Sequence, residues 1–141
     1  MAAIVGFLHD PCCATLLTAL PFETSFDRSR RLMITRAWGH ITLPDLRAYQ
    51  QELGQTEEFD STWAHIFDAR DAVRFDISSA DIRALADTSM LATSARRAMV
   101  ATNPTTFGEF RMYATSREFR AGGPEIGVFT TLEEAIEWVT S

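Results

Sequence analysis

The chain has 141 residues, enough for one domain with its own core, and its 46% hydrophobic and 23% charged content is ordinary for a globular protein. Its formal net charge is -6, with acids and bases spread evenly, so nucleic acid and anionic membrane are poor electrostatic partners. All 13 basic residues are arginines, which excludes Schiff-base chemistry, a lysine general base and a Walker-type phosphate site.

Residues 1–22 form an apolar arm ahead of a single domain at residues 23–141. A signal peptide needs a positive start, but the first basic residue is Arg28. The polar stretch at residues 9–11 leaves the apolar run too short to be a transmembrane segment. We expect the arm to bury against the domain's helices, or against a second copy in a homodimer, through the leucines Leu8, Leu16, Leu17 and Leu20.

The cysteine content indicates a reducing compartment. Cys12 and Cys13 are adjacent and are the two cysteines of the chain, and neighbouring cysteines pair only with strain. We therefore expect no disulfide and a cytoplasmic location. With His9 and Asp10 they offer too few ligands at poor spacing, so no metal site is expected.

The first half of the domain reads as a hairpin followed by a helix, a strand and a second helix. Residues 23–27 and 31–38 form the hairpin, and residues 63–68 form the next strand, with a loop expected at residues 69–76. Each helix begins at a capping box, in which a hydroxyl and an acid three residues later satisfy each other's backbone N–H groups: Thr42 with Asp45, and Ser78 with Asp81. The apolar faces are Leu43, Leu46, Tyr49 and Leu53, ended by Gly54, and then Ile82, Leu85, Ala86, Ser89 and Met90.

The second half repeats the strand–helix unit twice. A strand at residues 97–102 stops at Asn103-Pro104, a favoured N-cap followed by a favoured first helical residue. After the turn at residues 122–124, a strand at residues 125–129 leads to Thr131, which caps the last helix with Glu134. The two apolar faces are Phe107, Phe110, Tyr113 and Ala114, and then Leu132, Ala135, Ile136 and Val139.

The order of elements predicts an α/β fold. Crossover helices require parallel neighbouring strands, and the first hairpin adds an antiparallel edge. We expect a single domain with a mixed, mostly parallel sheet of about five strands and four helices. The strands at residues 63–68 and 97–102 are predicted to be parallel neighbours.

Four local phrases, taken with their spacing, resemble the STAS domains (SpoIIAA-like anti-sigma-factor antagonists), and in particular their uncharacterised branch with a CRAL-TRIO-like fold. The resemblance covers residues 23–140, and the phrases are Gly39-His-Ile-Thr-Leu-Pro-Asp-Leu46, Ile66-Phe-Asp-Ala-Arg70, Arg97-Ala-Met-Val-Ala101 and Val128-Phe-Thr-Thr-Leu-Glu-Glu-Ala-Ile-Glu-Trp138. It implies the α/β fold already expected, and either a lipophilic-ligand or a regulatory role.

The resemblance also implies a phosphorylation site at Ser78 or Ser79. Regulatory members of the family carry an Asp-Ser-Ser/Thr-Gly pattern at the start of the second helix. Here the place reads Asp76-Ile-Ser-Ser-Ala80, with an extra residue after the Asp and Ala in place of Gly. A serine at a helix start is usually a cap, so we expect Ser78 to cap the helix.

The candidate ligand-binding residues lie near the ends of two strands. Asp68 and Arg70 follow one strand, where they either hold a polar ligand or form an ordinary ion pair. Asn103, Phe107 and Arg111 belong to the helix after the next strand, at its cap, its apolar face and its basic surface. His65, between Trp63 and Phe67, is expected to pack rather than to act as a base.

These observations leave two functions open and disfavour a third. The first is a non-catalytic module that binds a small lipophilic or anionic ligand at the carboxyl ends of the strands. The second is a regulatory protein-interaction domain, with or without phosphorylation at Ser78 or Ser79. No nucleophile–base pair and no cofactor motif is recognisable, so neither an enzyme nor a cofactor is expected. An apolar cavity of a few hundred cubic ångströms favours the first function.

Overall fold

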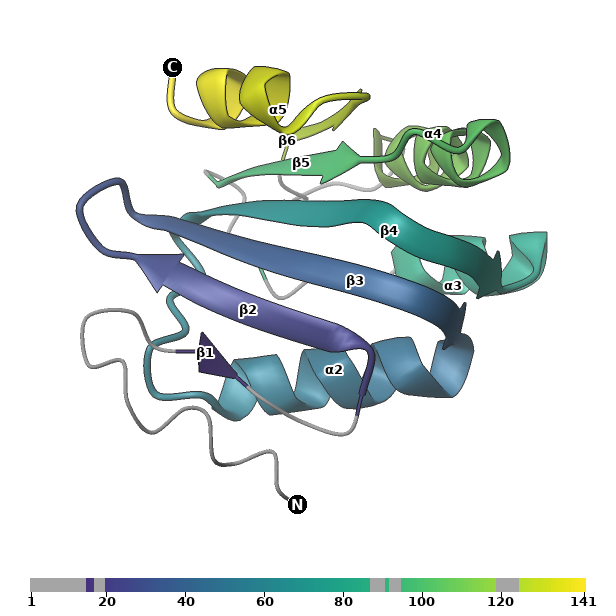
Figure 1. The fold of residues 1–141 in the computed structure, drawn as a ribbon, viewed down its shortest axis with the longest axis horizontal. Helices are drawn as coiled ribbons and strands as arrows, with labels where there is room; N and C mark the ends of the chain where they lie inside the picture. The colour runs from purple at the N-terminus through teal and green to yellow at the C-terminus, as the bar shows by residue number, and fades with distance from the viewer. Residues whose placement is uncertain (1–14, 17–19, 87–90, 92–94, 119–124) are drawn as a thin grey trace.

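The computed structural model describes residues 15–16, 20–86, 91, 95–118 and 125–141. One sheet with the strand order β1-β2-β3-β4-β5-β6 runs through them (Figure 1). Its strands are β1 (Thr15–Leu16), β2 (Phe22–Asp27), β3 (Leu32–Thr42), β4 (Ala64–Asp76), β5 (Arg96–Val100) and β6 (Glu125–Phe129). The helices are α2 (Leu43–Gln55), α3 (Ser79–Ala86), α4 (Pro104–Glu118) and α5 (Leu132–Val139).

The sheet is mixed and mostly parallel, as predicted. β1 and β2, and β2 and β3, pair antiparallel, whereas each strand from β3 to β6 pairs parallel with the next. The predicted neighbours are confirmed, because His65 lies opposite Arg97 and Asp68 lies opposite Val100 in parallel register. The four predicted helices are also present, and the two residues of β1 add a sixth, edge strand to the five expected.

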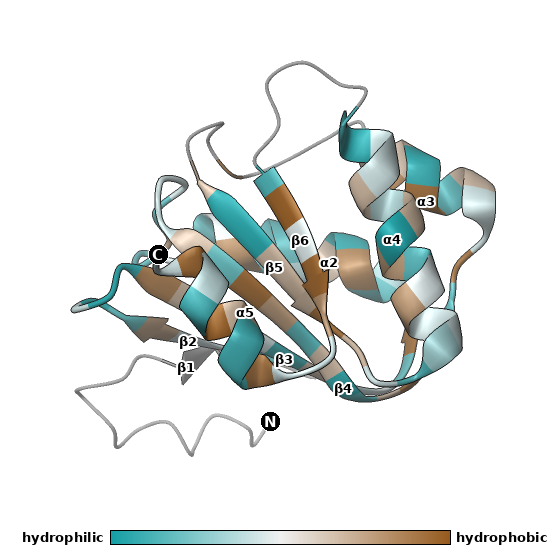
Figure 2. Cartoon of the chain, turned by 90° about the horizontal axis from the view of Figure 1, so that it is seen from above, coloured by the Kyte–Doolittle hydropathy of each residue, from teal (hydrophilic) through white to brown (hydrophobic). Residues whose placement is uncertain are grey.

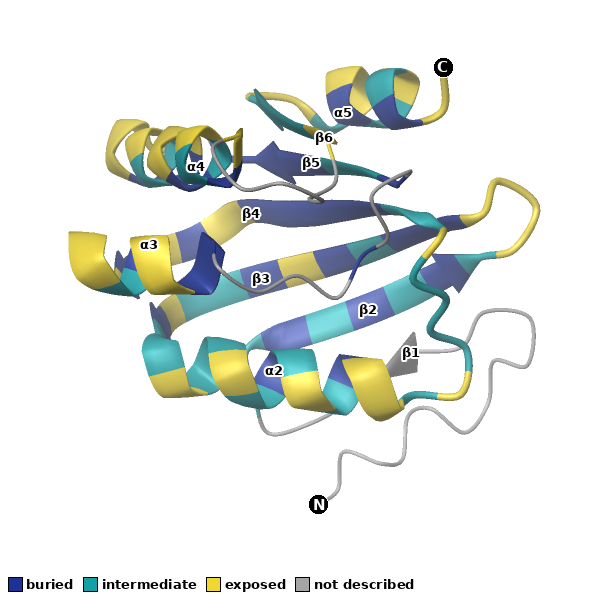
Figure 3. Cartoon of the chain, turned by 180° about the vertical axis from the view of Figure 1, so that it is seen from behind, coloured by how far each residue is buried: buried dark blue, intermediate teal, exposed yellow. Residues whose placement is uncertain are grey.

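The helices form two unequal layers on the sheet. From β3 to β6 each strand lies beside the preceding one, so the chain moves across the sheet in one direction. Because connections between parallel strands are right-handed, the helices that join these strands all lie on the same face. α2, α3 and α4 cover that face, and α5 returns on the other (Figure 2). Figure 3 shows the first face, where the burial is concentrated in the strands and on the inner sides of the helices.

The local signals that start the helices are confirmed in atomic detail. In the capping box of α2, Asp45 N donates to Thr42 Oγ1 at 3.3 Å and Thr42 N donates to Asp45 Oδ2 at 3.1 Å. The same pair of bonds joins Ser78 and Asp81 at 3.1 and 3.3 Å. Asn103 Oδ1 accepts from Thr105 N at 2.8 Å, and Thr131 Oγ1 accepts from Glu134 N at 3.2 Å. Each cap satisfies N–H groups that a helix start leaves free.

The prediction of a loop at residues 69–76 is wrong. β4 continues through these residues to Asp76, which lies opposite Thr42 at the end of an equally extended β3. Ala72 and Phe75 are buried there, and β5 pairs only with the first part of β4, from His65 to Asp68. The charged residues of the extension therefore lie beyond β5, where a strand edge tolerates charge. That polarity made a strand look like a loop in the sequence.

The arm is described only in part. Thr15–Leu16 pairs with β2, and Leu20 packs against the main core. Phe22, assigned to the arm from the sequence, lies in β2 and stacks on Tyr49 with ring centroids 4.6 Å apart. Several predicted features lie outside the described residues: Leu8, His9, Asp10, Cys12, Cys13, Leu17, Ser89, Met90 and the turn at residues 122–124.

Candidate functional site

A cavity of about 60 Å³ lies between the sheet and the helices α2, α3 and α4. This is well below the range of about 300–1,000 Å³ typical of sites for drug-sized ligands. At about 10–15 Å³ for each water-sized position, it has room for a few waters or one small molecule. The cavity therefore meets the sequence-based criterion for a ligand site in its place and lining, but not in its size.

The walls of the cavity are mainly aromatic and aliphatic. Phe67, Phe75 and Phe110 surround one side, with ring centroids 5.5–6.2 Å apart and tilted or edge-to-face contacts. Such contacts between rings add to the stabilisation from burial alone. The aliphatic part of the wall comes from Leu46, Ile77, Ile82, Leu85 and Met99.

Arg97 is the cation of this cavity. It lies on β5, where the alternation of the strand places it on the side of Met99 and α4. Its Nη1 donates to the hydroxyl of Tyr113 at 3.2 Å, and its Cζ lies 5.8 Å from the centroid of that ring. Its Nε is buried with no hydrogen-bond partner, and Arg97 forms no ion pair with any residue that the structure describes.

Glu109 is the acid of the same cavity. It lies on α4, and its Oε1 is buried with no hydrogen-bond partner among the described residues. Burial raises the pKa of Glu109, because an apolar surrounding disfavours the charged carboxylate. Arg97 and Glu109 thus line one cavity with opposite charges, yet they form no ion pair with each other.

A buried polar network supports the wall behind Arg97. Thr35 Oγ1 lies 2.8 Å from Thr24 Oγ1, 2.7 Å from the Tyr49 hydroxyl and 2.9 Å from His65 Nε2. Burial lowers the pKa of His65 well below its ordinary value, and the charge of Arg97 lowers it further, so this histidine is neutral. Burial also raises the pKa of Tyr49. The network holds Tyr49, which lines the cavity, in one position.

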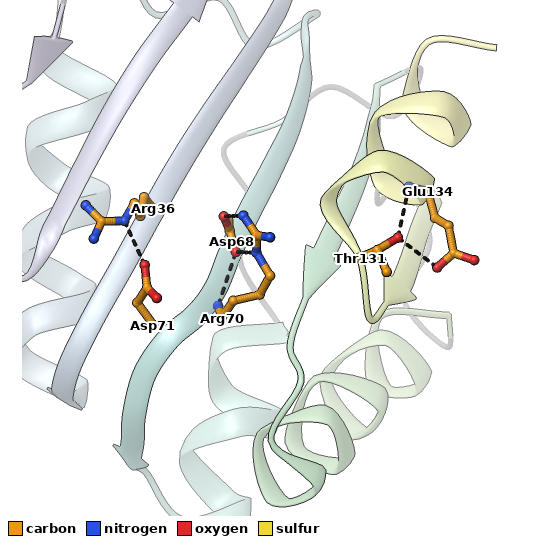
Figure 4. Close-up of polar contacts among 6 residues, drawn as sticks. All are labelled: Arg36, Asp68, Arg70, Asp71, Thr131 and Glu134. Atoms are coloured by element: carbon orange, nitrogen blue, oxygen red, sulfur yellow. Dashed lines mark hydrogen bonds and ion pairs between the residues drawn. The ribbon is translucent and has the colours of Figure 1, made fainter.

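Asp68 and Arg70 lie on the other face of the sheet, the side of α5 (Figure 4). Arg70 Nε donates to Asp68 Oδ1 and its Nη2 to Asp68 Oδ2, each at 2.9 Å, and Asp68 is only 5% exposed. The hydrogen bonds to Asp68 raise the pKa of Arg70. The pair has the geometry of the ordinary ion pair that the sequence left open.

The other three candidate ligand residues lie on α4 or at its start. Asn103 is the N-cap, Phe107 is half-buried against the main core, and Arg111 is exposed. The structure therefore divides the five candidates between two faces of the sheet and does not bring them together. As a set of ligand contacts they stay a prediction.

Ser78 and Ser79 are both exposed at the start of α3. Ser78 Oγ accepts the hydrogen bond from Asp81 N, as expected of a cap. Arg74, four residues before Ser78 in the sequence, lies 3.7 Å from Asp76 in an exposed ion pair. Phosphorylation at either serine stays a prediction.

Sequence reasoning missed Arg97 and Glu109, the two charged residues that line the cavity. A signal for each exists in hindsight. Arg97 shares the core-facing side of its strand with Met99, and Glu109 precedes the buried Tyr113 by about one helical turn. A charge at such a position is a reason to look for a partner or a ligand.

No protein-family model and no curated protein matches the chain. Among solved structures it is similar to an uncharacterized protein of the DUF3478 family, with a SpoIIAA-like fold, from Shewanella loihica PV-4. The match has a TM-score of 0.56 and 14% sequence identity, and covers 86% of this chain and 96% of that one. The chain has a SpoIIAA-like fold.

At 14% identity the likeness shows the SpoIIAA-like fold and no function. It confirms the resemblance found in the sequence at the level of the fold. Within the described residues no helix is long and apolar enough to cross a membrane, and no group of three or more histidines, cysteines and acids is placed to hold a metal ion.

Proposed function

We propose that this SpoIIAA-like chain is a non-catalytic binding module that holds one small molecule in the cavity between the sheet and α2, α3 and α4. The observation that carries the proposal is the state of two polar atoms. Arg97 Nε and Glu109 Oε1 are buried at a mainly apolar cavity and have no partner in the described part of the chain. Buried polar groups in proteins are almost always satisfied, so a bound molecule is the expected partner.

The test is native mass spectrometry of the full chain purified from its own host. We expect a bound small molecule, released on denaturation. The variant Ile82→Phe places extra volume in the cavity wall and should lose the bound mass. The matched control Ile136→Phe adds the same volume against the core on the α5 side and should keep it. A wild-type chain that carries no bound molecule would contradict the proposal.

The alternative is a regulatory protein-interaction domain controlled by phosphorylation. The exposure of Ser78 and Ser79 at the start of α3 favours it, because a helix N-terminus accommodates a phosphate. Detection of phosphoserine at either position in protein taken from cells would support this alternative. A homodimer and a cytoplasmic location remain expectations from the sequence alone.

A further inference from the structure

We infer that the ligand of this cavity is a small carboxylate that also carries a hydrogen-bond donor, with the carboxylate at Arg97 and the donor at Glu109 Oε1. This inference rests on the proposed function and names the chemistry of its ligand. The donor is a hydroxyl or an ammonium group, and the rest of the molecule is a short apolar chain.

The position of Arg97 points to a carboxylate. Within the described residues its guanidinium donates one side-chain hydrogen bond, to the hydroxyl of Tyr113 at 3.2 Å, and forms no ion pair. The nearby polar network adds no second cation, since burial lowers the pKa of His65 well below its ordinary value. A carboxylate offers a hydrogen-bond acceptor to Nε and a negative charge to pair with the guanidinium. Such charge-assisted hydrogen bonds are stronger than neutral ones.

The position of Glu109 points to a donor on the same molecule. Its Oε1 has no hydrogen-bond partner among the described residues, and Arg97, the cation in the same cavity wall, forms no ion pair with it. A molecule that lies between the two side chains can satisfy both at once. A ligand with a second negative charge is disfavoured, because that charge would face the carboxyl of Glu109.

The remaining walls limit the size and polarity of the ligand. Phe67, Phe75 and Ile82 leave an apolar remainder, and a volume of about 60 Å³ leaves room for only a few carbon atoms. A short chain with two polar groups fits this mainly apolar lining better than a sugar, whose hydroxyls would outnumber the polar groups of the wall.

The test is calorimetric titration of the full chain with four-carbon compounds that differ only in their polar groups. The compounds with both groups are the hydroxybutyrates and aminobutyrates in all their positional isomers. Butyrate has the carboxylate alone, and butan-1-ol has the donor alone. We expect at least one compound with both groups to bind about tenfold or more tightly than either control, a difference set by the second polar contact. The choice between hydroxyl and ammonium donors follows from which of the two sets binds.

Two variants test whether Arg97 causes the preference for a carboxylate and Glu109 the preference for a donor. Arg97→Met keeps an unbranched apolar stem without the guanidinium and should abolish the advantage of carboxylates over butan-1-ol. Glu109→Leu should abolish the advantage of the bifunctional compounds over butyrate. Arg47→Met, on the exposed side of α2, is the matched control and should leave every affinity unchanged. Circular dichroism of each variant checks that it is folded.

The outcomes separate this inference from the proposed function. If butyrate and butan-1-ol bind as tightly as the bifunctional compounds, the cavity is a ligand site but the inference is overturned. If no compound binds while native mass spectrometry finds a bound molecule, the inference is again overturned and the proposed function stands. If both experiments find nothing, water alone fills the cavity and both fail.

Discussion

The hydroxyl of Tyr49 lies 3.2 Å from His65 Nε2, and both atoms also contact Thr35 Oγ1. This triangle joins α2 to two central strands of the sheet and is closed to solvent, since His65 is only 2% exposed. A buried polar group without a partner is costly, so the three side chains depend on one another.

The burial of His65 predicts that the chain loses stability in mild acid. As the pH falls through about 6.5, the unfolded chain binds a proton at this histidine, whereas the folded chain, in which the pKa is lowered, does not. The free energy of unfolding should therefore decrease as the pH decreases, and this histidine contributes at most about 1.4 kcal/mol per pH unit. Glu109 acts in the opposite sense, because its raised pKa favours the folded state on acidification.

Urea denaturation between about pH 7.5 and pH 5.5 measures this dependence. His65→Gln keeps a polar atom near Nε2 and removes the titration, so its curve should be flatter than that of the wild type. Parallel curves for the two proteins would show that His65 does not titrate differently in the folded and unfolded states.

The Tyr49 hydroxyl is expected to contribute more to stability than that of Tyr113. Tyr49→Phe removes a partner of both Thr35 and His65 inside the core and should cost about 1–3 kcal/mol. Tyr113→Phe removes one bond, to the half-buried Arg97, and should cost about 1 kcal/mol or less. Thermal and urea unfolding of both variants give the comparison. Equal losses would argue against a cooperative network around Thr35.

Two glycines should respond in opposite directions to the same substitution. A Cβ at Gly127 would lie 2.8 Å from Phe129 Cε2 and 3.3 Å from Trp138 Cη2, so Gly127→Ala should cost about 1–3 kcal/mol. A Cβ at Gly108 in α4 meets nothing within 4 Å, and Gly108→Ala should stabilise the helix by up to about 1 kcal/mol. Melting temperatures of the two variants suffice as the measurement. A neutral Gly127→Ala would mean that the Phe129 ring moves aside freely.

The cap at the start of α3 is open to a direct test. Ser78→Ala should cost about 1 kcal/mol, the usual loss for an N-cap, whereas Ser78→Asp should be nearly neutral because Asp caps as well as Ser. Ser79→Ala is the control, because it changes the neighbouring exposed serine without removing the cap. If Ser78→Ala and Ser79→Ala unfold alike, the hydrogen bond from Asp81 N contributes little.

Much of the fold could be predicted from the sequence because its signals are local. A capping box such as that of Thr42 and Asp45 needs four consecutive residues, and each apolar stripe needs one helix. The extension of β4 to Asp76 could not be predicted in the same way. It depends on pairing with β3, more than thirty residues earlier in the chain, and its own residues are polar.

The candidate site could be predicted only as a region. The sequence indicated the strand ends and the helix that begins at Pro104, and the cavity lies beside that helix. Arg97 and Glu109 come to line one cavity only when α4 packs on the sheet, and the volume left beside them is a property of packing. Asp68 lies on the opposite face of the sheet from the cavity because side chains alternate along β4 and its neighbour Phe67 faces the cavity.

The unequal division of apolar side chains between the faces of the sheet also sets how the molecule opens. α5 rests on a small cluster, in which Ala135 and Val139 are its buried residues, and Arg96 helps to hold it through the carbonyl of Trp138 at 2.7 Å. α2, α3 and α4 share the much larger cluster on the other face. Amide hydrogens in α5 should therefore exchange with solvent through a partial opening that leaves β3 and β4 paired, well before the whole chain unfolds. Hydrogen exchange would then show the C-terminal segment as a separate cooperative unit, able to detach while the cavity side of the sheet stays folded.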